Sequence, residues 1–557
     1  MNKLLCTLFA CLLVVSVIKA QSVDELLEPV THTYALKNVT IVPKPGAMIE
    51  GGTIVIKDGL IHTVGKDVTI PANAKVLEAD SMYVYAGFID ALSNIGIPQP
   101  KPDNNRERPR GETRANPPYE MAGIMPHAEA ADMISTEDKD IEAFRKLGIT
   151  AVQTAPYGGM LRGQTAVIIL AGDKASDMIL VEEKAMVGTF EDAGQVFPAT
   201  IMGVMTKYRE LFGQARQMMA HQAAYEVNPA MVRPESDEAL ESLAEVIEEE
   251  MMMLIVAPEI KDLYRAMTLE RDMNVNLIMA NVKEGWRMVD QLKATGEPIL
   301  VSTDLPKEIK EEKDEEAKDM DDEAKALMKR KKETYDNFVG QAATFAEAGI
   351  PFAFSTMGTK ASDLRGNLKR MVDAGLPHEK ALAALTTTPA EMLGVSNVLG
   401  TVEKGKIANL VISDKPYFEE GSNVRMVIAD GHVFEFEAKK KKSGKKSAEE
   451  GGASPEAIAG KWSYTIEVPG QTTTGTMELT NNGTGIEGTI SSDQMGTTKM
   501  KDAELDGSTL TFSMSVDIQG QSMNLDYSLD FSTDTFEGNV SVGSYGTFDI
   551  SGTKIPE

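Results

Sequence analysis

The sequence predicts an α/β protein: a (β/α)8 TIM-like barrel inserted in a composite N-/C-terminal β-sandwich, followed by a separate C-terminal all-β domain. Three observations predict this fold class. Between residues 87 and 394, apolar runs such as MMMLIVA and VNLIMA alternate with amphipathic runs such as DKDIEAFRKLG, the pattern of βα units around a buried parallel sheet. Roughly 300 residues of this pattern favour a closed eight-stranded barrel. Shorter β-type runs flank it, and the chain beyond residue 460 alternates with period two.

The composite β domain is predicted from both flanks of the barrel. Its N-terminal part, residues 21–86, contains YALKNVTIV, GGTIVIKDG and LIHTVG, which are strand-type runs separated by turn signals. Its C-terminal part, residues 395–437, contains GTVEKGKIANLVISD and VRMVIADGHVFEF. These later runs fit the first hairpins better than they fit barrel strands. We therefore expect the two flanks to form one sheet domain.

Two segments of unusual composition interrupt or follow these domains. Residues 307–333 are charged on nearly every face and predict a solvated helical insertion; an acidic partner-binding segment is the alternative. Residues 438–459 are rich in lysine, glycine and serine without apolar periodicity, which predicts a linker; contact with an anionic surface is the alternative. In residues 460–557, LTFSMSVDI and MNLDYSLDF alternate strictly around a tight turn, which predicts a small β-barrel or β-sandwich.

Residues 1–20 have the composition of a signal peptide. MNK supplies a positive start, LLCTLFACLLVVSVI an apolar core, and an alanine precedes Gln21. Both cysteines, Cys6 and Cys11, lie in this segment, so we expect no disulfide, thiolate ligand or cysteine nucleophile in the mature chain. No later apolar run is long enough to span a bilayer. We expect an exported protein, periplasmic or secreted; lipidation near Cys11 is the alternative.

The chain is strongly acidic. Its formal net charge is −28, and removing Lys3 and Lys19 with the signal peptide makes it −30. We expect no nucleic-acid partner, because binding to a phosphate backbone depends on lysine and arginine. An excess of negative charge is expected to keep an exported protein soluble.

Three stretches resemble the amidohydrolase superfamily. GGTIVIKDGLIHTVGKDVTIP followed by AGFID is similar to the family's N-terminal β domain leading into its first barrel strand. LGITAVQTAPYGGMLRGQTAVI is similar to a stretch in periplasmic, imidazolonepropionase-related members. EKALAALTTTPAEMLGVSNVLGTVEKGKIANLVISD resembles the family's closing helix and its Gly-x-x-x-x-Gly-Lys return into the β domain. The resemblance covers residues 31–436, and the tail after residue 460 is similar to a β domain appended to some exported relatives.

This resemblance implies hydrolysis of non-peptide, often cyclic, C–N bonds. In the family, Zn²⁺ or another divalent metal activates water at the carboxyl ends of the barrel strands, held by histidines and assisted by a carboxylate. The first strand's pattern is Asp-x-His-x-His, of which this chain keeps Asp90, the one candidate catalytic residue. The matching ligand positions are expected to line a pocket without a metal or other cofactor: Leu92, Asn94, Ala257, Ala280 and Met357.

The other potential metal ligands are scattered along the chain. Of the six histidines, only His127 and His221 fall in candidate loops or helices at the barrel mouth. Carboxylates near strand ends could suit Mg²⁺ or Ca²⁺, although one of them, Glu284, begins an amphipathic helix where a carboxylate favours the helix dipole. These carboxylates are Asp90, Glu259, Glu284 and Asp304.

Other enzyme classes lack their signatures here. The sequence contains no P-loop, no dinucleotide-binding glycine motif and no Gly-x-Ser-x-Gly elbow. The PYGGMLRGQ loop carries Arg162 and either cradles an anion or makes a tight turn over the barrel mouth. Residues 104–114, NNRERPRGETR, either bring guanidinium groups to the mouth or form a solvated insertion.

The leading prediction is a non-catalytic paralogue, whose mostly apolar site binds a small molecule or whose barrel scaffolds a partner. That partner would be another copy of the chain or an active paralogue. The alternative is an active hydrolase of non-peptide C–N bonds with an atypical site, using displaced carboxylates or a ligand from a partner chain. A third interpretation assigns the function to the C-terminal domain, as a module that binds glycans or surfaces.

Overall fold

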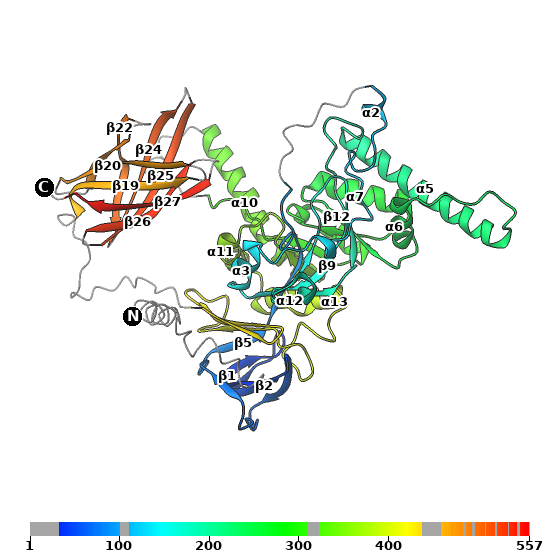
Figure 1. Ribbon diagram of the computed structural model, residues 1–557, viewed down its shortest axis with the longest axis horizontal. Coiled ribbons are helices and arrows are strands. Elements are labelled where there is room, and N and C mark those ends of the chain that lie inside the picture. Colours follow the sequence, from blue (N-terminus) through cyan, green and yellow to red (C-terminus); the bar gives the residue numbers. More distant parts are fainter. Residues whose placement is uncertain are drawn as a thin grey trace, which may run out of the picture. The chain divides into compact units, whose positions relative to one another are not determined.

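The computed structural model describes residues 33–100, 111–309, 322–436 and 458–555, the last range with gaps at residues 469–470, 483–485, 493–495, 507, 519–520, 533 and 543–545. The predicted signal peptide, most of the predicted linker, residues 104–110 and residues 310–321 lie outside the described residues. The chain divides into two compact units, Met1–Lys441 and Lys442–Glu557, which are described separately (Figure 1).

An eight-stranded sheet joins strands from the two flanks of the first unit. Its strands follow the order β18-β17-β16-β5-β1-β2-β3, with β4 paired to β1. Ala86 at the end of β5 lies opposite Leu410 at the start of β16, so the segment between these residues is inserted into the sheet. The bounds are β1 (Thr33–Val42), β2 (Ile49–Lys57), β3 (Leu60–Gly65), β4 (Lys75–Leu77), β5 (Tyr83–Ala86), β16 (Leu410–Ser413), β17 (Val424–Ala429) and β18 (His432–Glu435).

The inserted segment contains a second group of short, buried strands. β6 pairs in parallel with β7, and β11, β12 and β13 pair in parallel in that order. Val282 bridges to Val301 of β14, and β14 pairs in parallel with β15. The hydroxyl of Ser355 in β15 donates to the carbonyl of Leu92 in β6 at 2.7 Å, which brings the last strand back to the first. The bounds are β6 (Phe88–Ser93), β7 (Ile149–Thr154), β8 (Leu161–Gln164), β9 (Ala166–Ile169), β10 (Ile179–Val181), β11 (Ala185–Gly188), β12 (Met252–Val256), β13 (Leu277–Ala280), β14 (Ile299–Ser302) and β15 (Phe352–Ser355).

One part of this strand group corrects the prediction of a parallel sheet. β9 pairs antiparallel with β7, and β8 pairs antiparallel with β11. Only residues 155–160 separate β7 from β8, too short a connection for the crossover that a parallel strand requires. The chain therefore reverses direction between β7 and β11.

Helices cover the outer side of these strands (Figure 1). Helix α10 begins inside the predicted charged insertion, residues 307–333, and its described residues are mostly exposed up to Asn337; residues 310–321 of that insertion lie outside the described residues. The helices are α2 (Glu112–Ala115), η2 (Ala131–Met133), α3 (Lys139–Arg145), α4 (Ala175–Met178), α5 (Ile201–Val227), α6 (Glu238–Ile247), α7 (Ile260–Met273), η3 (Gly285–Arg287), α8 (Val289–Thr295), α10 (Asp322–Ala348), α11 (Ala361–Asp373), α12 (His378–Leu385) and α13 (Thr387–Met392).

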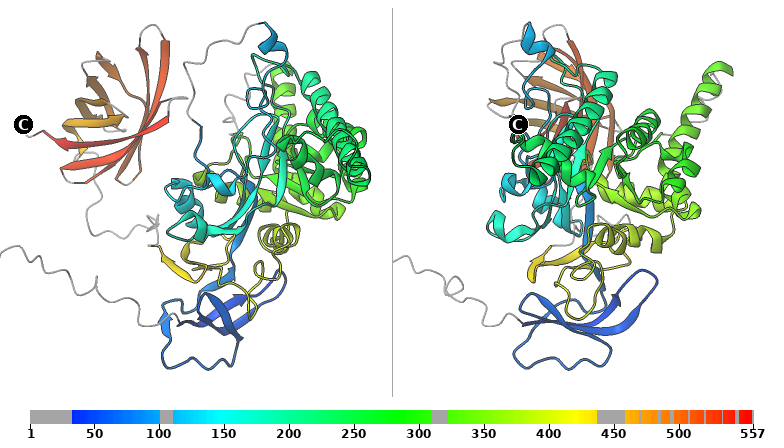
Figure 2. Two further views of the ribbon diagram at one scale, coloured as in Figure 1. Left: turned by 45° about the vertical axis from the view of Figure 1, so that its right-hand side comes forward. Right: turned by 90° about the vertical axis from the view of Figure 1, so that its right-hand side faces the viewer.

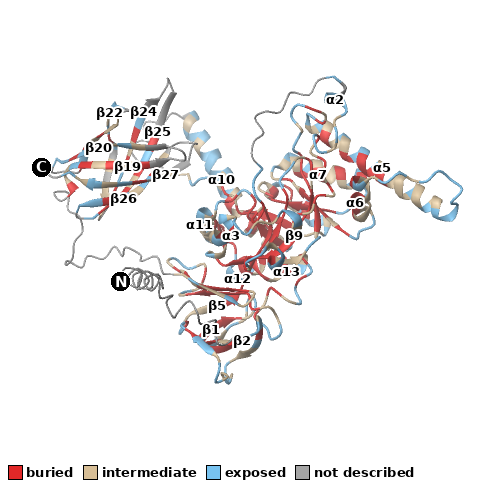
Figure 3. Ribbon diagram, viewed as in Figure 1, coloured by how far each residue is buried: buried red, intermediate tan, exposed pale blue. Residues whose placement is uncertain are grey.

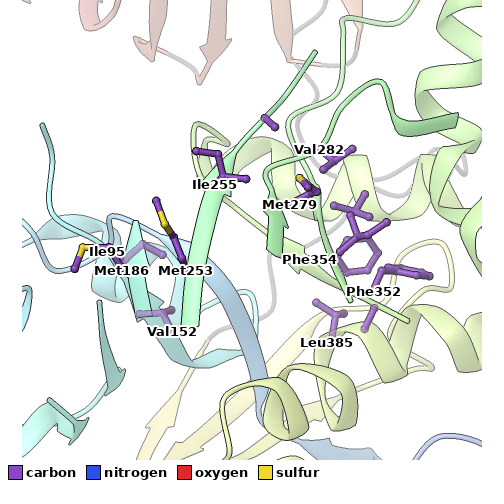
Figure 4. Packing of buried hydrophobic residues seen from close by; sticks show 14 of the residues in the cluster. Ile95, Val152, Met186, Met253, Ile255, Met279, Val282, Phe352, Phe354 and Leu385 are labelled. Carbon is purple, nitrogen blue, oxygen red and sulfur yellow. The ribbon is translucent and has the colours of Figure 1, made fainter. Parts of the chain in front are cut away.

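The period-two alternation of the strands separates two apolar cores. Met253 and Ile255 of β12 and Phe354 of β15 point to the helix side and belong to the largest cluster, part of which Figure 4 shows. Leu254 of β12 and Ala353 of β15 belong instead to a smaller cluster on the opposite side of the strands, the inner cluster. Both sides of the strands are thus buried, as the concentration of buried residues in Figure 3 shows.

The second unit is all β. Its nine strands form one antiparallel sheet in the order β22-β21-β20-β19-β27-β26-β25-β24-β23. β21 and β22 at one end of this order contact β23 and β24 at the other end, so the sheet curves into a barrel-like form (Figure 2). Trp462, Phe531 and Phe536 pack edge to face in its core. The bounds are β19 (Gly460–Val468), β20 (Gln471–Asn481), β21 (Ile486–Ser492), β22 (Gly496–Lys499), β23 (Lys501–Asp506), β24 (Thr509–Ile518), β25 (Gln521–Phe531), β26 (Thr535–Val542) and β27 (Gly546–Lys554).

Candidate functional site

The structure brings three of the sequence-predicted site positions into one place. Leu92, Ala280 and Met357 all belong to the inner cluster, at or just beyond the carboxyl ends of β6, β13 and β15. Their exposed fractions are 0%, 0% and 8%, so these side chains are packed against one another and against inner-cluster residues of neighbouring strands. The strand ends that would carry ligands in a metal site carry apolar packing instead.

The fourth position, Ala257, lies on the other side of its strand. Along β12 the inner cluster takes Met252, Leu254 and Val256, while Ala257 packs in the cluster that faces the helices. A residue of odd number in this strand points away from the inner side because side chains alternate. The inner position at the end of β12 is therefore that of Val256, one residue before the predicted one.

Asn94, the fifth position, follows the end of β6. Its side-chain amide donates a hydrogen bond to the carbonyl of Ala155 at 2.7 Å. Ala155 in turn follows β7, and its own N–H donates to the carbonyl of Ser93 at 2.9 Å. Asn94 thus holds the ends of two neighbouring strands together.

Asp90 is buried within β6, with an exposed fraction of 1%. Its carboxyl accepts a hydrogen bond from the backbone N–H of Thr356 at 3.0 Å, a second from the hydroxyl of Thr356 and a third from the N–H of Leu92 at 3.2 Å. Burial raises the pKa of Asp90 to about 7, and the hydrogen bonds from Thr356 and Leu92 oppose that rise. The geometry makes Asp90 a link between β6 and the segment after β15.

Two ion pairs lie around Met357. The guanidinium of Arg162 pairs with Glu191 at 2.6 Å and also lies 3.9 Å from the sulfur of Met357. A second ion pair joins Lys283 to Asp304 at 2.5 Å. Gly358, the residue after Met357, lies near Asp304. A Cβ built on Gly358 would be 4.0 Å from the Asp304 carboxylate. We call Arg162, Glu191, Lys283 and Asp304 the mouth charges.

The mouth charges differ in their access to solvent. The Arg162 side chain is 10% exposed and its buried Nε has no hydrogen-bond partner among the described residues. Lys283 and Asp304 are 29% and 41% exposed. Arg162 and Asp304 are predicted from the sequence, whereas Glu191 and Lys283 are not. Each ion pair joins residues from different loops, and the sequence does not show which loops meet. The only signal was their position after a strand end.

Two of the other candidate ligands, Glu284 and His221, have structural partners, whereas His127 has a buried nitrogen without one in the described part of the chain. Glu284 accepts the N–H of Ile260 at 3.0 Å and so satisfies a free donor in the first turn of α7, next to Glu259. The ring of His221 on α5 bonds to the carbonyl of Val232 at 2.9 Å. His127 has a buried Nδ1 without a partner among the described residues.

These donors do not fit the divalent metal that the family uses. Among the residues that the structure describes, no three His, Cys, Asp or Glu side chains gather as a possible metal site. The inner ends of the strands carry leucine, valine, alanine and methionine, and Asp90 is already engaged by Thr356. We derive no catalytic step through a metal at this site.

Comparison with known proteins shows what the chain is similar to. A model of the amidohydrolase family matches residues 198–434. An amidohydrolase from Thermotoga maritima MSB8 has a similar crystal structure, with a TM-score of 0.59 and 20% sequence identity, over 72% of this chain and 100% of that one. Residues 198–434 thus match the amidohydrolase family, and the fold of the first unit is similar to that of a solved amidohydrolase.

Two further solved structures show weaker similarity to this chain. A Xaa-Pro dipeptidase with bound methionine in its active site has a TM-score of 0.41 and 15% identity, over 72% of this chain and 100% of that one. Phenylurea hydrolase B has a TM-score of 0.42 and 12% identity, over 72% of this chain and 96% of that one. No curated protein matches the sequence. No helix in the described ranges is both long and apolar enough to cross a membrane.

Proposed function

We propose that this chain is an exported amidohydrolase-superfamily protein that lacks metal-dependent catalysis and binds a small molecule, or a partner chain, at its strand-end site. The observation that carries the proposal is the inner cluster, where Leu92, Ala280 and Met357 occupy strand ends and pack as a core. Leucine and alanine offer no donor atom, and a methionine thioether is not a ligand for the zinc that activates water in such sites, so we propose that the scaffold is retained for binding. We also propose that β6 to β15 form a distorted (β/α)8 barrel, which supports placing this site at its mouth.

The mouth charges indicate the chemistry of the ligand. Arg162 and Lys283 would attract a carboxylate or phosphate, while Glu191 and Asp304 would attract an amine. The sulfur of Met357 lies 3.9 Å from the guanidinium of Arg162 and offers an apolar contact beside the first pair. We propose that the small molecule carries charged groups on a short apolar body.

Elemental analysis of the mature chain, expressed with Zn²⁺, Mn²⁺ and Fe²⁺ available, tests the loss of the metal. We expect less than about a tenth of an equivalent after dialysis, because the donor set does not fit. A full equivalent that survives dialysis would overturn the proposal. Thermal unfolding with small carboxylates, amines and zwitterions then tests binding: stabilisation of the wild type that is lost in Arg162→Met is the expected result.

The second candidate is an active hydrolase of non-peptide C–N bonds with an atypical site. The specific observation in its favour is the part-exposed Lys283–Asp304 pair, which places a carboxylate where a substrate could reach it. Hydrolysis of cyclic amides or dipeptides that is lost in Asp304→Asn, but kept in Asp373→Asn on α11, would establish this activity. Asp373 is a matched control because it also pairs with a lysine, Lys369, at 2.6 Å.

A further inference from the structure

The eight-stranded sheet of the first unit has two edges that differ. At one edge, β3 is covered: the N–H of Ile61 donates to the carbonyl of Lys406 at 2.8 Å, and the N–H of Gly405 donates to the carbonyl of Ile61 at 2.8 Å. At the other edge, β18 pairs with β17 alone among the described strands. An uncovered edge strand offers a row of backbone donors and acceptors to another chain.

The register of the β17–β18 hairpin shows which backbone groups of β18 do not bond to β17. The N–H of Phe436 donates to the carbonyl of Arg425 at 2.9 Å, so Phe436 bonds toward β17. In an antiparallel pair the residues that bond to the partner alternate, so Phe434 and His432 also bond toward β17. The backbone groups of Val433 and Glu435 consequently point to the open side.

Two hollows adjoin β18, and residues of helix α3 line both of them. One hollow has a volume of about 1070 Å³ and the other about 1050 Å³. Both are lined by Val433, Phe434 and Glu435 of β18 and by Glu142 and Arg145 of α3. The guanidinium of Arg145 lies 3.8 Å above the ring of Phe434 and fixes α3 against the strand. We call this space between β18 and α3 the edge groove.

The charge and shape of the edge groove define what fits it. The first hollow is lined by seven carboxylates against three lysine or arginine side chains; besides Glu142 and Glu435, the carboxylates are Asp58, Glu137, Asp138, Asp173 and Asp430. The second hollow contains Val424, Phe434 and Phe436 on its sheet side, and its charged lining is Arg145, Lys146 and Arg365 against Glu142 and Glu435. An extended segment alternates its side chains between two directions, so its basic residues suit the carboxylates of the first hollow and its apolar residues suit the aromatic side of the second.

We propose that the edge groove binds an extended, basic segment of a partner protein, which adds to the sheet as a strand beside β18. Backbone hydrogen bonds to Val433 and Glu435 supply affinity, and the carboxylates along α3 and the β17–β18 turn select lysine or arginine. This interaction is independent of the strand-end site and its ligand.

Fluorescence anisotropy with the full mature chain tests the proposal. The probe is a short labelled peptide of alternating valine and lysine. We expect it to bind, to bind less tightly at high salt, and to lose at least about tenfold in affinity when its lysines become glutamates. Absence of binding, or equal binding of the acidic peptide, would overturn the proposal.

Backbone methylation separates strand addition from simple charge attraction. N-methyl groups placed on alternate residues of the peptide remove every second N–H and leave the charge unchanged. We expect one set of positions to reduce affinity at least about tenfold and the other set to have little effect, because only one set faces β18. Equal effects of the two sets would exclude a strand partner.

Protein variants locate the bound peptide. Glu142→Lys and Glu435→Lys are expected to weaken binding, whereas Glu226→Lys at the exposed end of α5 is the control that should not. An equal loss in the control would contradict the assignment. A further variant replaces Lys439, Lys440, Lys441 and Lys442 by serine. If the peptide binds only to that variant, the chain's own basic segment is the occupant and the partner proposal is wrong.

Discussion

Asp90 and Thr356 lie 266 residues apart in the chain and are joined by two hydrogen bonds, one to the backbone N–H and one to the hydroxyl of Thr356. Asp90 belongs to the first strand of the inserted segment, and Thr356 follows the last. Together with the bond from Ser355 to the carbonyl of Leu92, this contact joins the two ends of the strand series. Asp90, which matches the family's sequence pattern, therefore helps to hold the two ends of the strand series together.

Removing the Asp90 carboxyl is expected to destabilise the first unit. Asp90→Ala leaves two buried donors of Thr356 without an acceptor, and each such group costs about 1–3 kcal/mol. Asp90→Asn retains an oxygen acceptor and is expected to lose less. Urea unfolding of both variants measures the difference. A loss in Asp90→Ala no larger than in Asp90→Asn would show that the contact adds little to stability.

The stability of the first unit should also depend on pH through Asp90. Its pKa is raised from 3.8 to about 7, so the folded chain holds a proton that the unfolded chain has released between these values. The stabilisation is complete below about pH 4 and is lost as the pH rises through about 7. Asp90→Asn cannot titrate, so the free energy of unfolding of the wild type relative to this variant should fall across that window. A constant difference from pH 4 to 8 would contradict the shifted pKa.

The inner cluster should behave as a packed core. Leu254 is 2% exposed and packs within that cluster, so Leu254→Ala is expected to cost about 2–5 kcal/mol through lost burial and a residual cavity. Met202 on α5 is 80% exposed, and Met202→Ala should change the free energy of unfolding by less than about 0.5 kcal/mol. Denaturant unfolding compares the two. A near-neutral Leu254→Ala would mean that the strand interior is open to water.

The core of the second unit contains a buried hydroxyl group, that of Tyr527, without a hydrogen-bond partner among the described residues. The ring of Tyr527 stacks on Phe512 with a centroid distance of 4.7 Å. Tyr527→Phe keeps the stack and removes the buried hydroxyl, so it should raise the free energy of unfolding by up to about 1 kcal/mol. Tyr464→Phe, which removes a hydroxyl bonded to Ser491, is the comparison and should not stabilise. Thermal unfolding measures the effect. A lower stability of Tyr527→Phe than of the wild type would mean that the hydroxyl makes a hydrogen bond after all, and would contradict the prediction.

The sequence predicts the strands best where their side chains follow a local pattern of burial. The unbroken apolar run of β12 and the period-two alternation of strands in the second unit are both visible in the sequence, because each depends only on neighbouring residues. The inner position at the end of β12 is held by Val256 and not by Ala257, because the sequence pattern does not show where the strand ends. The antiparallel pairing of β8 depends on a short connection, which the pattern does not show either. The pairing of Arg162 with Glu191, and of Lys283 with Asp304, depends on how separate loops meet. Contacts between separate loops produce no periodic pattern in the sequence, so they could not be predicted from it.

The pairing of β5 with β16 has a consequence for the order of events during synthesis. Ala86 lies opposite Leu410, so about 320 residues must leave the ribosome after β5 before its second neighbour exists. At about 5–20 residues per second, β5 waits roughly 15–65 s with one side of its backbone unpaired. The first strands made are thus among the last to be completed, and the newborn chain exposes an apolar edge for much of its synthesis. A chaperone that holds β1 to β5 during this interval would reduce aggregation more than one that acts after release.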